Sequence, residues 1–264
     1  MPTAAQQILV PKSQAAALRY ILECVENGYH HHTRGRLPAH KAATFAQKMA
    51  DAYPVLATRG ARAYAKEKGR ASVRFVIFPA LDDPMDLHYY ILATDGTGPV
   101  HHQERLYDAR QPTGRVQCWR RYEDGYAPLY ELVGRPVNAR SGPTHRWTWV
   151  MSDSLYGRVA AWLEKAAGRA RSSHEKKPDY LYKAIEAVRN MPGFHGIRQQ
   201  KRALIRALDV PKELAVAMRL GDLGGYVDKS LPVFDNARTL AAVLDQCQLA
   251  TGAEPVDTEP VTAA

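Results

Sequence analysis

Residues 73–93, VRFVIFPALDDPMDLHYYILA, decide the fold that we expect for this chain. The segments 73–78 and 87–93 are rich in β-branched and aromatic residues, which favour strands. Asp82, Asp83 and the proline after them form a turn signal between these two segments. The stretch therefore predicts an antiparallel pair of strands in the middle of the chain.

More strand candidates follow this pair toward the C-terminus. Four further segments have a strand-like composition, namely 100–107, 115–122, 129–133 and 146–151. The loops between them are short, and short loops favour antiparallel neighbours over parallel ones. We therefore predict an α+β fold with a central antiparallel sheet of about five to six strands, at roughly residues 72–151.

Helical patterns flank the predicted sheet on both sides. Before the sheet we expect helices at 13–26, 39–52 and 55–67. After it we expect a helix capped by Ser152 or Asp153, and further helices at 180–189, 195–208, 212–220 and 236–249. The chain then divides into a basic helical region, a sheet with a packing helix, a C-terminal helical region and a disordered tail, at 1–70, 71–167, 178–249 and 250–264.

The positive charge of the chain is concentrated in two blocks. The net charge is +9 over 264 residues. Residues 1–70 hold 11 Lys and Arg against 4 Asp and Glu (net +7), and residues 140–206 hold 14 against 5 (net +9). Residues 71–139 have a net charge of −2 (7 against 9), and residues 207–264 of −5 (4 against 9). Two separate basic blocks indicate a directed surface, and phosphate backbones are its commonest partner.

Several classes of protein are disfavoured by what the sequence lacks. No apolar run approaches the roughly 18 to 20 residues that span a bilayer, and residues 1–11 have no signal pattern, so we expect a cytoplasmic protein without membrane attachment. Cys24, Cys118 and Cys247 are far apart and show no disulfide or zinc spacing. No glycine-rich phosphate loop of the ATP or dinucleotide type is present.

Basic side chains within the two blocks are the expected contacts to nucleic acid. His31 and His32 belong to a polar stretch at 29–36 that reads as a loop, where adjacent histidines rarely share one metal ion. The helix at 195–208 should turn its arginines and lysine outward. The full set of expected contacts is His31, His32, Arg34, Arg36, Arg59, Arg62, Lys66, Arg169, Arg171, Lys176, Lys177, Arg198, Lys201, Arg202 and Arg206.

One catalytic hypothesis rests on a tyrosine. Tyr180 and Lys183 have the Tyr-x-x-Lys spacing of the nicking enzymes of rolling-circle replication, and the order of sheet and tyrosine helix is similar to that family. The resemblance implies a divalent metal held by histidines such as His88, with the tyrosine hydroxyl attacking a phosphodiester. The chain departs from the family because Tyr90 stands where the second histidine of the pair belongs.

Other enzymatic arrangements are open as alternatives. A metal-independent ribonuclease needs a histidine among basic residues, and His145, His174 and His195 all meet that condition. Asp82, Asp83 and Asp86 together offer ligands for a divalent ion, although a turn between strands explains them more simply.

Aromatic residues alternate with arginines on two of the expected strands. These are Trp119-Arg120-Arg121-Tyr122 and Arg146-Trp147-Thr148-Trp149. A sheet face that carries both residue types can stack the bases of a single strand. The competing interpretation, which we favour for the tryptophans, is that they form the core beneath the helices.

The function that we predict is nucleic-acid binding through the basic helical surfaces, with DNA somewhat favoured over RNA. The role would be accessory or regulatory in DNA replication, transfer or transcription, without catalysis and without a cofactor. The alternatives are a phosphodiester-cleaving enzyme, which would need a divalent metal if it resembles the nickases, and a protein-interaction factor with an acidic partner. Substitutions at Arg34 and Arg36, or at Arg198, Lys201 and Arg202, should weaken binding, and substitutions of charges within 71–139 should not.

Overall fold

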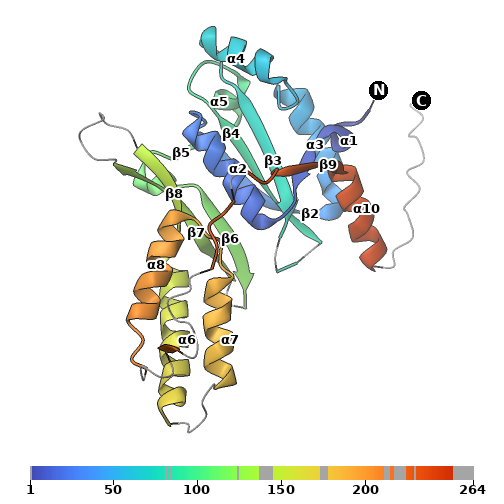
Figure 1. Ribbon diagram of the computed structural model, residues 1–264. Coiled ribbons are helices and arrows are strands. Elements are labelled where there is room, and N and C mark those ends of the chain that lie inside the picture. The colour runs from blue at the N-terminus through green and yellow to red at the C-terminus, as the bar shows by residue number, and fades with distance from the viewer. Residues whose placement is uncertain are drawn as a thin grey trace.

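The strand pair predicted from residues 73–93 is present. In the computed structural model, β3 (Val73–Pro79) and β4 (Asp86–Ala93) pair antiparallel, with Phe78 opposite His88 and Val76 opposite Tyr90 (Figure 1). The structure describes residues 2–80, 82–83, 85–123, 125–136, 145–172, 178–210, 215–216, 224–228 and 230–251.

Helices and strands are interspersed along the described chain. The helical elements are α1 (Ala4–Gln7), α2 (Gln14–Glu26), α3 (Ala39–Ala52), α4 (Arg59–Glu67), α5 (Pro99–Gln103), the 3₁₀ turn η1 (Pro112–Gly114), α6 (Asp153–Ser172), α7 (Asp179–Arg189), α8 (His195–Arg206) and α10 (Leu240–Thr251). The other strands are β1 (Leu9–Pro11), β2 (His31–Pro38), β5 (Tyr107–Asp108), β6 (Gln117–Tyr122), β7 (Gly125–Pro136), β8 (His145–Met151) and β9 (Phe234–Thr239).

The fold class is α+β, as predicted, but the prediction of one central sheet is wrong. The described strands form a four-stranded sheet in the order β3-β4-β2-β5, a three-stranded sheet in the order β6-β7-β8 and a two-stranded sheet of β1 and β9. All the pairings between these strands are antiparallel. The meander breaks after β4 because the neighbour of β4 is a strand from the N-terminal region.

That neighbour is β2, where the sequence predicts a polar loop, and this prediction is also wrong. β2 pairs with β4 over its whole length, from His31 opposite Ala93 to Pro38 opposite Asp86. Gly35 permits close packing on this strand, because a Cβ atom there would come within 2.5 Å of the Tyr89 hydroxyl oxygen. Pairing with a distant segment therefore overrides the local polar composition.

Two other predicted elements are corrected by the structure. Residues 99–103 form the helix α5 rather than the start of a strand, because Pro99 occupies the first helical turn and only β5 remains of the strand predicted at 100–107. The helix predicted at 236–249 starts later, at Leu240, because the residues before it form β9 and pair with β1. Most of the helix predicted at 212–220 lies outside the described residues.

The helices with a clear apolar stripe follow the prediction closely. The helix predicted at 39–52 is α3, and the one predicted from Ser13 is α2, with the Ser13 hydroxyl accepting the Ala16 N–H at 3.2 Å. α6, α7 and α8 likewise begin within one residue of the expected positions. The helix predicted at 55–67 forms only from Arg59, after its Thr58 cap.

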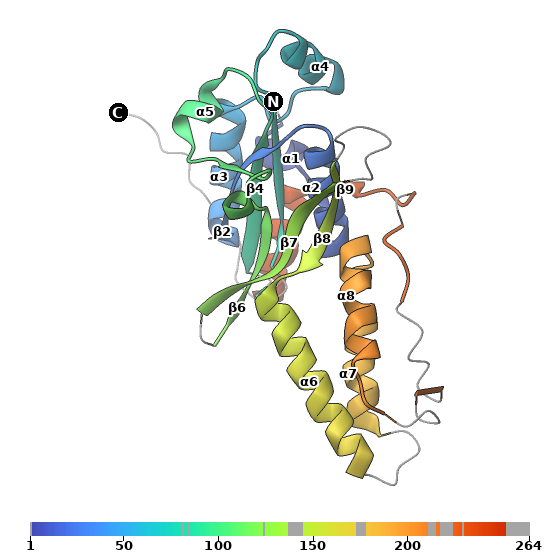
Figure 2. The same cartoon turned by 90° about the vertical axis from the view of Figure 1, so that its left-hand side faces the viewer.

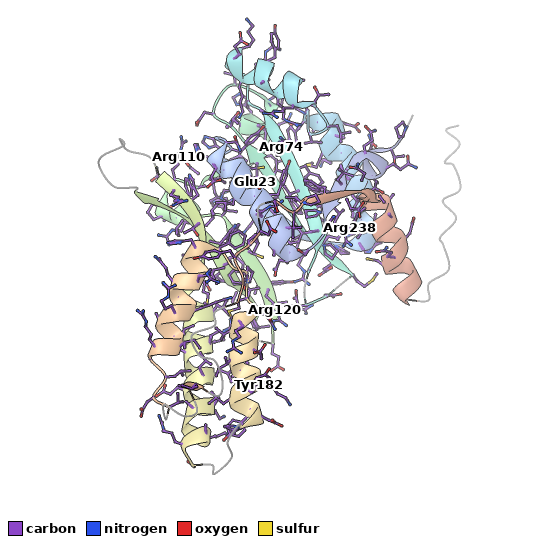
Figure 3. All side chains as sticks on the ribbon, in the orientation of Figure 1. Glu23, Arg74, Arg110, Arg120, Tyr182 and Arg238 are labelled. Atoms are coloured by element: carbon purple, nitrogen blue, oxygen red, sulfur yellow. The ribbon has the colours of Figure 1, made fainter. Side chains whose placement is uncertain are left out.

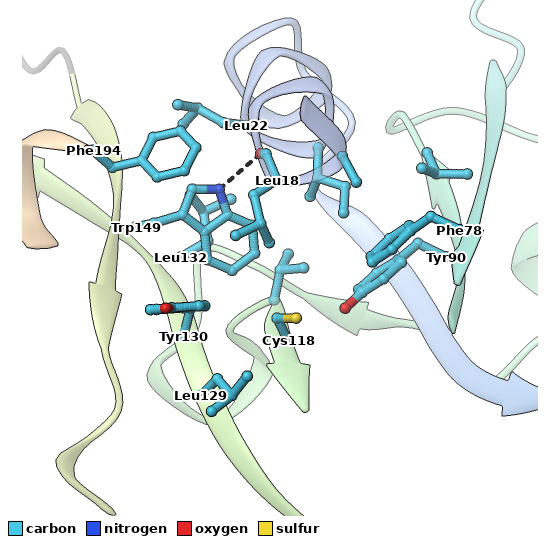
Figure 4. Close-up of a cluster of buried hydrophobic side chains, with 14 of the residues drawn as sticks. Leu18, Leu22, Phe78, Tyr90, Cys118, Leu129, Tyr130, Leu132, Trp149 and Phe194 are labelled. Carbon is cyan, nitrogen blue, oxygen red and sulfur yellow. Dashed lines mark hydrogen bonds between the residues drawn. The ribbon is translucent and has the colours of Figure 1, made fainter. Parts of the chain in front are cut away.

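The main core lies where the two larger sheets meet α2. Trp149 of β8 is fully buried, and its indole Nε1 donates to the Leu18 carbonyl of α2 at 2.8 Å (Figure 4). α8 packs on the opposite side of β8, where Gly196 sits so close that a Cβ would come within 2.6 Å of the Trp149 carbonyl oxygen. Trp149 is thus a core residue, as the favoured interpretation of the tryptophans predicts.

The helices extend to two opposite ends of the molecule. Figures 1 and 2 both show α4 above the four-stranded sheet and α6 with α7 below the three-stranded sheet. Within the described residues no helix is both long and apolar enough to cross a lipid bilayer. The two basic blocks that the sequence defines are therefore far apart where they are carried by α4 and by α6 and α7.

Candidate nucleic-acid interface

The N-terminal basic residues gather around a cleft of about 420 Å³ between α2, α4 and β3. We call it the α4 cleft, because Arg59, Arg62 and Lys66 of α4 line it. All three are predicted contacts, and one short helix brings them together. α4 buries none of its residues, and Lys66 ties it to the molecule by donating from Nζ to the Asn27 carbonyl at 2.9 Å. An exposed helix of this kind presents cations rather than contributing to the core.

Arg74 of β3 joins these three cations in the α4 cleft. Its guanidinium carbon lies 5.7 Å from the ring centre of Tyr20 and 5.9 Å from that of Tyr29. The side chain is half-buried, and it makes neither a hydrogen bond nor an ion pair within the described part of the chain. Figure 3 shows Arg74 beside Glu23 of α2 at this cleft. Arg74 is therefore held by two tyrosine rings with its donors unused.

The protein does not neutralise the positive charge of the α4 cleft. Among the described residues that line it, Glu23 supplies the carboxylate, and Arg19 already binds that carboxylate at 3.3 Å. Burial, together with the nearby charge of Arg74, lowers the pKa of Arg62. Burial raises the pKa of Cys24 to about 12, so this thiol is neutral at pH 7 and adds no negative charge to the cleft. The α4 cleft therefore has an excess of positive charge that a bound anion would balance.

Arg34 and Arg36 line a second cavity, of about 350 Å³, between the two larger sheets. Arg34 stacks on Trp119, with its guanidinium carbon 5.2 Å from the ring centre, and Arg36 stacks on Tyr126 at 5.5 Å. We call this cavity the inter-sheet pocket. Its remaining lining residues are Gly35, His88 and Tyr90.

The aspartates of the turn between β3 and β4 hold Arg36 in place. Asp82 and Asp86 each accept a hydrogen bond from its guanidinium at 2.8 Å, and Asp83 accepts the Met85 backbone N–H in the turn. These contacts use the carboxylates that could otherwise hold a divalent ion. Among the described residues no cluster of three or more His, Cys, Asp or Glu has the geometry of a metal site.

The predicted histidine contacts are engaged inside the molecule. His32 is fully buried, and its Nε2 lies 2.8 Å from the Gly114 carbonyl oxygen. Burial lowers the pKa of His32 to about 4, so its ring is neutral at pH 7. His31 bonds to Asp95 at 2.8 Å, and Arg110 binds the same carboxylate at 3.1 Å. His32 therefore offers no surface to a nucleic acid in this conformation.

The residues of the nickase hypothesis do not come together. His88 is buried on β4, where burial and then the Arg36 charge lower its pKa to about 4. Tyr180 and Lys183 lie on α7, which Figures 1 and 2 both place at the lower end of the molecule, away from β4. A shared metal and nucleophile site is not formed by these three residues. Phosphodiester cleavage itself stays an alternative hypothesis.

Two cations of α8 that the sequence predicts to face outward are turned inward, which corrects that prediction. Lys201 is fully buried, and its Nζ donates to the carbonyls of Arg189 at 2.9 Å and Met191 at 2.6 Å. Arg198 is half-buried, donates to the Gly224 carbonyl and stacks on Tyr226 at 3.9 Å. Lys201 thus contributes two hydrogen bonds to backbone carbonyls at the end of α7, where helix geometry leaves the last carbonyls to other donors.

The remaining predicted contacts of the C-terminal block are exposed. Arg169, Arg202 and Arg206 lie on the surface of α6 and α8, and Arg171 binds Asp209 at 3.2 Å. Lys176, Lys177 and His174 lie outside the described residues, as does the side chain of His145, and His195 is exposed at the start of α8.

Sequence reasoning missed the residues in the middle of the chain that complete both cavities. These are Arg74 in the α4 cleft and Tyr126 in the inter-sheet pocket. The sequence does contain an indication that Arg74 is unusual. It is the lone charge in the strand segment 73–78, and strand alternation places it on the same face as Val76 and Phe78. For Trp119 the favoured interpretation of a core tryptophan is wrong, because its side chain is half-buried at the inter-sheet pocket.

Comparison with known proteins gives no information about the function of these cavities, so we interpret them from the chemistry of their lining residues. No protein-family model, no curated protein and no solved structure matches the chain.

Proposed function

We propose that the protein binds nucleic acid, with DNA favoured over RNA, and that the α4 cleft contacts the phosphate backbone. The observation that carries this proposal is Arg74, a half-buried guanidinium whose hydrogen-bond donors have no partner in the described part of the chain. Its Nε is buried without an acceptor among the described residues, and three further cations line the same cleft. A phosphate group would accept from the unused donors and offset the repulsion between Arg62 and Arg74.

The spacing of the basic blocks favours a polymer over a small anion. α4 and the exposed arginines of α6 and α8 occupy different ends of the molecule in Figures 1 and 2. One small anion would occupy the α4 cleft alone, whereas a chain of phosphates can contact both regions. Each phosphate contact releases condensed counterions, so such binding weakens steeply as salt rises.

The experiment measures the affinity of the protein for a fluorescent random-sequence oligonucleotide over a series of salt concentrations. Arg74→Met removes the charge of Arg74 and keeps most of its side-chain volume. Lys48→Met, at an exposed position on α3, removes one charge away from the α4 cleft and is the matched control. Single-stranded DNA, duplex DNA and RNA of one sequence give the preferred form.

Wild-type protein is expected to bind with an affinity that falls linearly as log affinity against log salt. Arg74→Met should weaken binding about tenfold at low salt, and Lys48→Met should change it less than twofold. This proposal replaces the expectation from the sequence that charges within 71–139 do not contribute, because Arg74 lines the α4 cleft. A flat salt response contradicts the proposal. So does an acidic polypeptide that competes as well as an oligonucleotide of equal charge, since that result favours the acidic protein partner instead.

A further inference from the structure

The inter-sheet pocket has the chemistry of a site for one planar ring. Its walls are two pairs of guanidinium and aromatic ring, Arg34 with Trp119 and Arg36 with Tyr126. These groups come from β2, β6 and β7, and His88 and Tyr90 of β4 complete the lining. Flat side chains of this kind stack on heterocyclic bases, and stacking does not depend on the identity of the base.

The walls of the inter-sheet pocket are fixed before any ligand arrives. Two ion pairs hold Arg36, at 2.8 Å to Asp82 and 2.8 Å to Asp86. Arg34 donates to Gln117 Oε1 at 2.7 Å, and Gln117 in turn donates to Glu131 at 2.7 Å. A pocket whose side chains are already ordered binds a ligand without the entropy cost of ordering them.

Polar groups at the inter-sheet pocket lack partners. His88 is only 5% exposed, and within the described part of the chain neither of its ring nitrogens makes a hydrogen bond. Its neutral ring carries one donor and one acceptor. Trp119 Nε1 and Arg36 Nη2 are also buried donors without a partner among the described residues. Buried polar groups are rarely left unsatisfied, so a ligand with both donor and acceptor atoms on one edge suits this pocket.

Charge distinguishes this pocket from the cavity beside it. Arg34 has no carboxylate partner in the described part of the chain, and burial lowers its pKa. The neighbouring cavity balances Arg120, Arg121 and Arg158 against Asp82, Asp83 and Glu123. A ring that carries a phosphate would therefore be attracted to the inter-sheet pocket rather than to its neighbour.

We propose that the inter-sheet pocket binds one unpaired nucleobase, stacked against Trp119 and Tyr126 with its polar edge on His88. The base belongs either to a single strand or to a free nucleotide, and both present the same ring and edge. The strand form of this inference rests on the proposed nucleic-acid binding, whereas the free-nucleotide form does not.

The test compares two single strands of about 12 nucleotides, one with bases and one with abasic sites throughout. Wild-type protein should bind the strand with bases about tenfold more tightly, because stacking one base contributes that much.

His88→Phe and Tyr126→Ala should each reduce this ratio below about threefold and leave the affinity for the abasic strand unchanged. Tyr126 is exposed, so its variant keeps the test valid even where His88→Phe fails to fold. Tyr182→Ala, at an exposed tyrosine on α7, is the control and should keep the full ratio (Figure 3).

The outcomes separate this inference from the proposed function. Equal, salt-dependent binding of both strands, together with no binding of a nucleoside monophosphate, overturns the base pocket and leaves phosphate binding intact. A nucleoside monophosphate that binds wild-type protein but not Tyr126→Ala, when neither strand binds, assigns the pocket to free nucleotides and overturns the proposed function. If wild-type protein binds neither the nucleotide nor the strand with bases, the inference fails altogether.

Discussion

The cations of α4 and of α8 belong to the two basic blocks of the sequence, but they have different surroundings in the structure. Arg62 and Lys66 of α4 each donate to one backbone carbonyl but stay at a surface cleft, on a helix that buries none of its residues. Lys201 of α8 is fully buried against the two carbonyls that it binds. The difference shows that the number of charges in a segment does not decide how many of them can meet a partner. What decides it is whether neighbouring elements bury the charged group among acceptors, as the end of α7 does for Lys201.

The largest effect that we expect tests Lys201 as a structural residue. Lys201→Met removes the buried charge and its two hydrogen bonds to the Arg189 and Met191 carbonyls. The free energy of unfolding should fall by about 3 kcal/mol, measured by urea denaturation at pH 7. Under folding conditions the affinity for an oligonucleotide should not change. Weakened binding with unchanged stability would show that Lys201 belongs with the cations of α4.

A second stability effect concerns His32, which the structure also turns inward. Its pKa is about 4 in the folded state against an ordinary value of 6.5, so the unfolded chain binds the additional proton first as pH falls. Stability is therefore lost as pH falls from about 6.5 to 4, by roughly 3 kcal/mol for this group. His88 contributes a loss of the same sign over the same window.

The measurement is the free energy of unfolding between pH 7 and pH 4 for wild-type protein and for His32→Gln. A glutamine amide can still donate to the Gly114 carbonyl, and it does not titrate. The variant should lose about half of the acid-dependent destabilisation. An identical pH profile in the two proteins would show that His32 is accessible to water.

A smaller effect is expected on binding at α4. Arg59→Ala combined with Lys66→Ala should weaken oligonucleotide binding about tenfold at low salt, without loss of secondary structure. Lys41→Ala combined with Lys48→Ala removes the same charge from exposed positions on α3 and should change the affinity less than twofold. Equal losses in the two double variants would mean that net charge alone governs binding.

The smallest effect is expected for the exposed arginines of α8. Arg202→Ala combined with Arg206→Ala should weaken binding less than threefold, because both side chains are exposed on α8, where water and salt screen their charge. Fluorescence anisotropy at low salt measures this effect. A loss as large as that of the α4 double variant would remove the distinction between the two regions.

The sequence predicted elements well where local pattern determined them. The helix at 39–52 follows its apolar stripe and Pro38, and the β3–β4 pair follows its composition and turn. β2 could not be predicted in this way, because its place in the sheet depends on pairing with β4 some 50 residues later.

The candidate site was predicted in part for the same reason. Arg59, Arg62 and Lys66 share one helix, so their gathering follows from the sequence. Arg74 reaches the same cleft only because β3 packs beside α2, and Lys201 is buried only because the end of α7 lies against α8. Contacts of this kind belong to the tertiary structure.

The salt dependence of binding tests the central claim most directly, because its slope counts the phosphates that the protein contacts. We compare wild-type protein with the α4 double variant (Arg59→Ala and Lys66→Ala) and the α8 double variant (Arg202→Ala and Arg206→Ala). The α4 variant should lower the slope of log affinity against log salt by about two, and the α8 variant by less than one. A reversed order, or a wild-type slope near zero, would contradict the assignment of the α4 cleft as the phosphate-binding site.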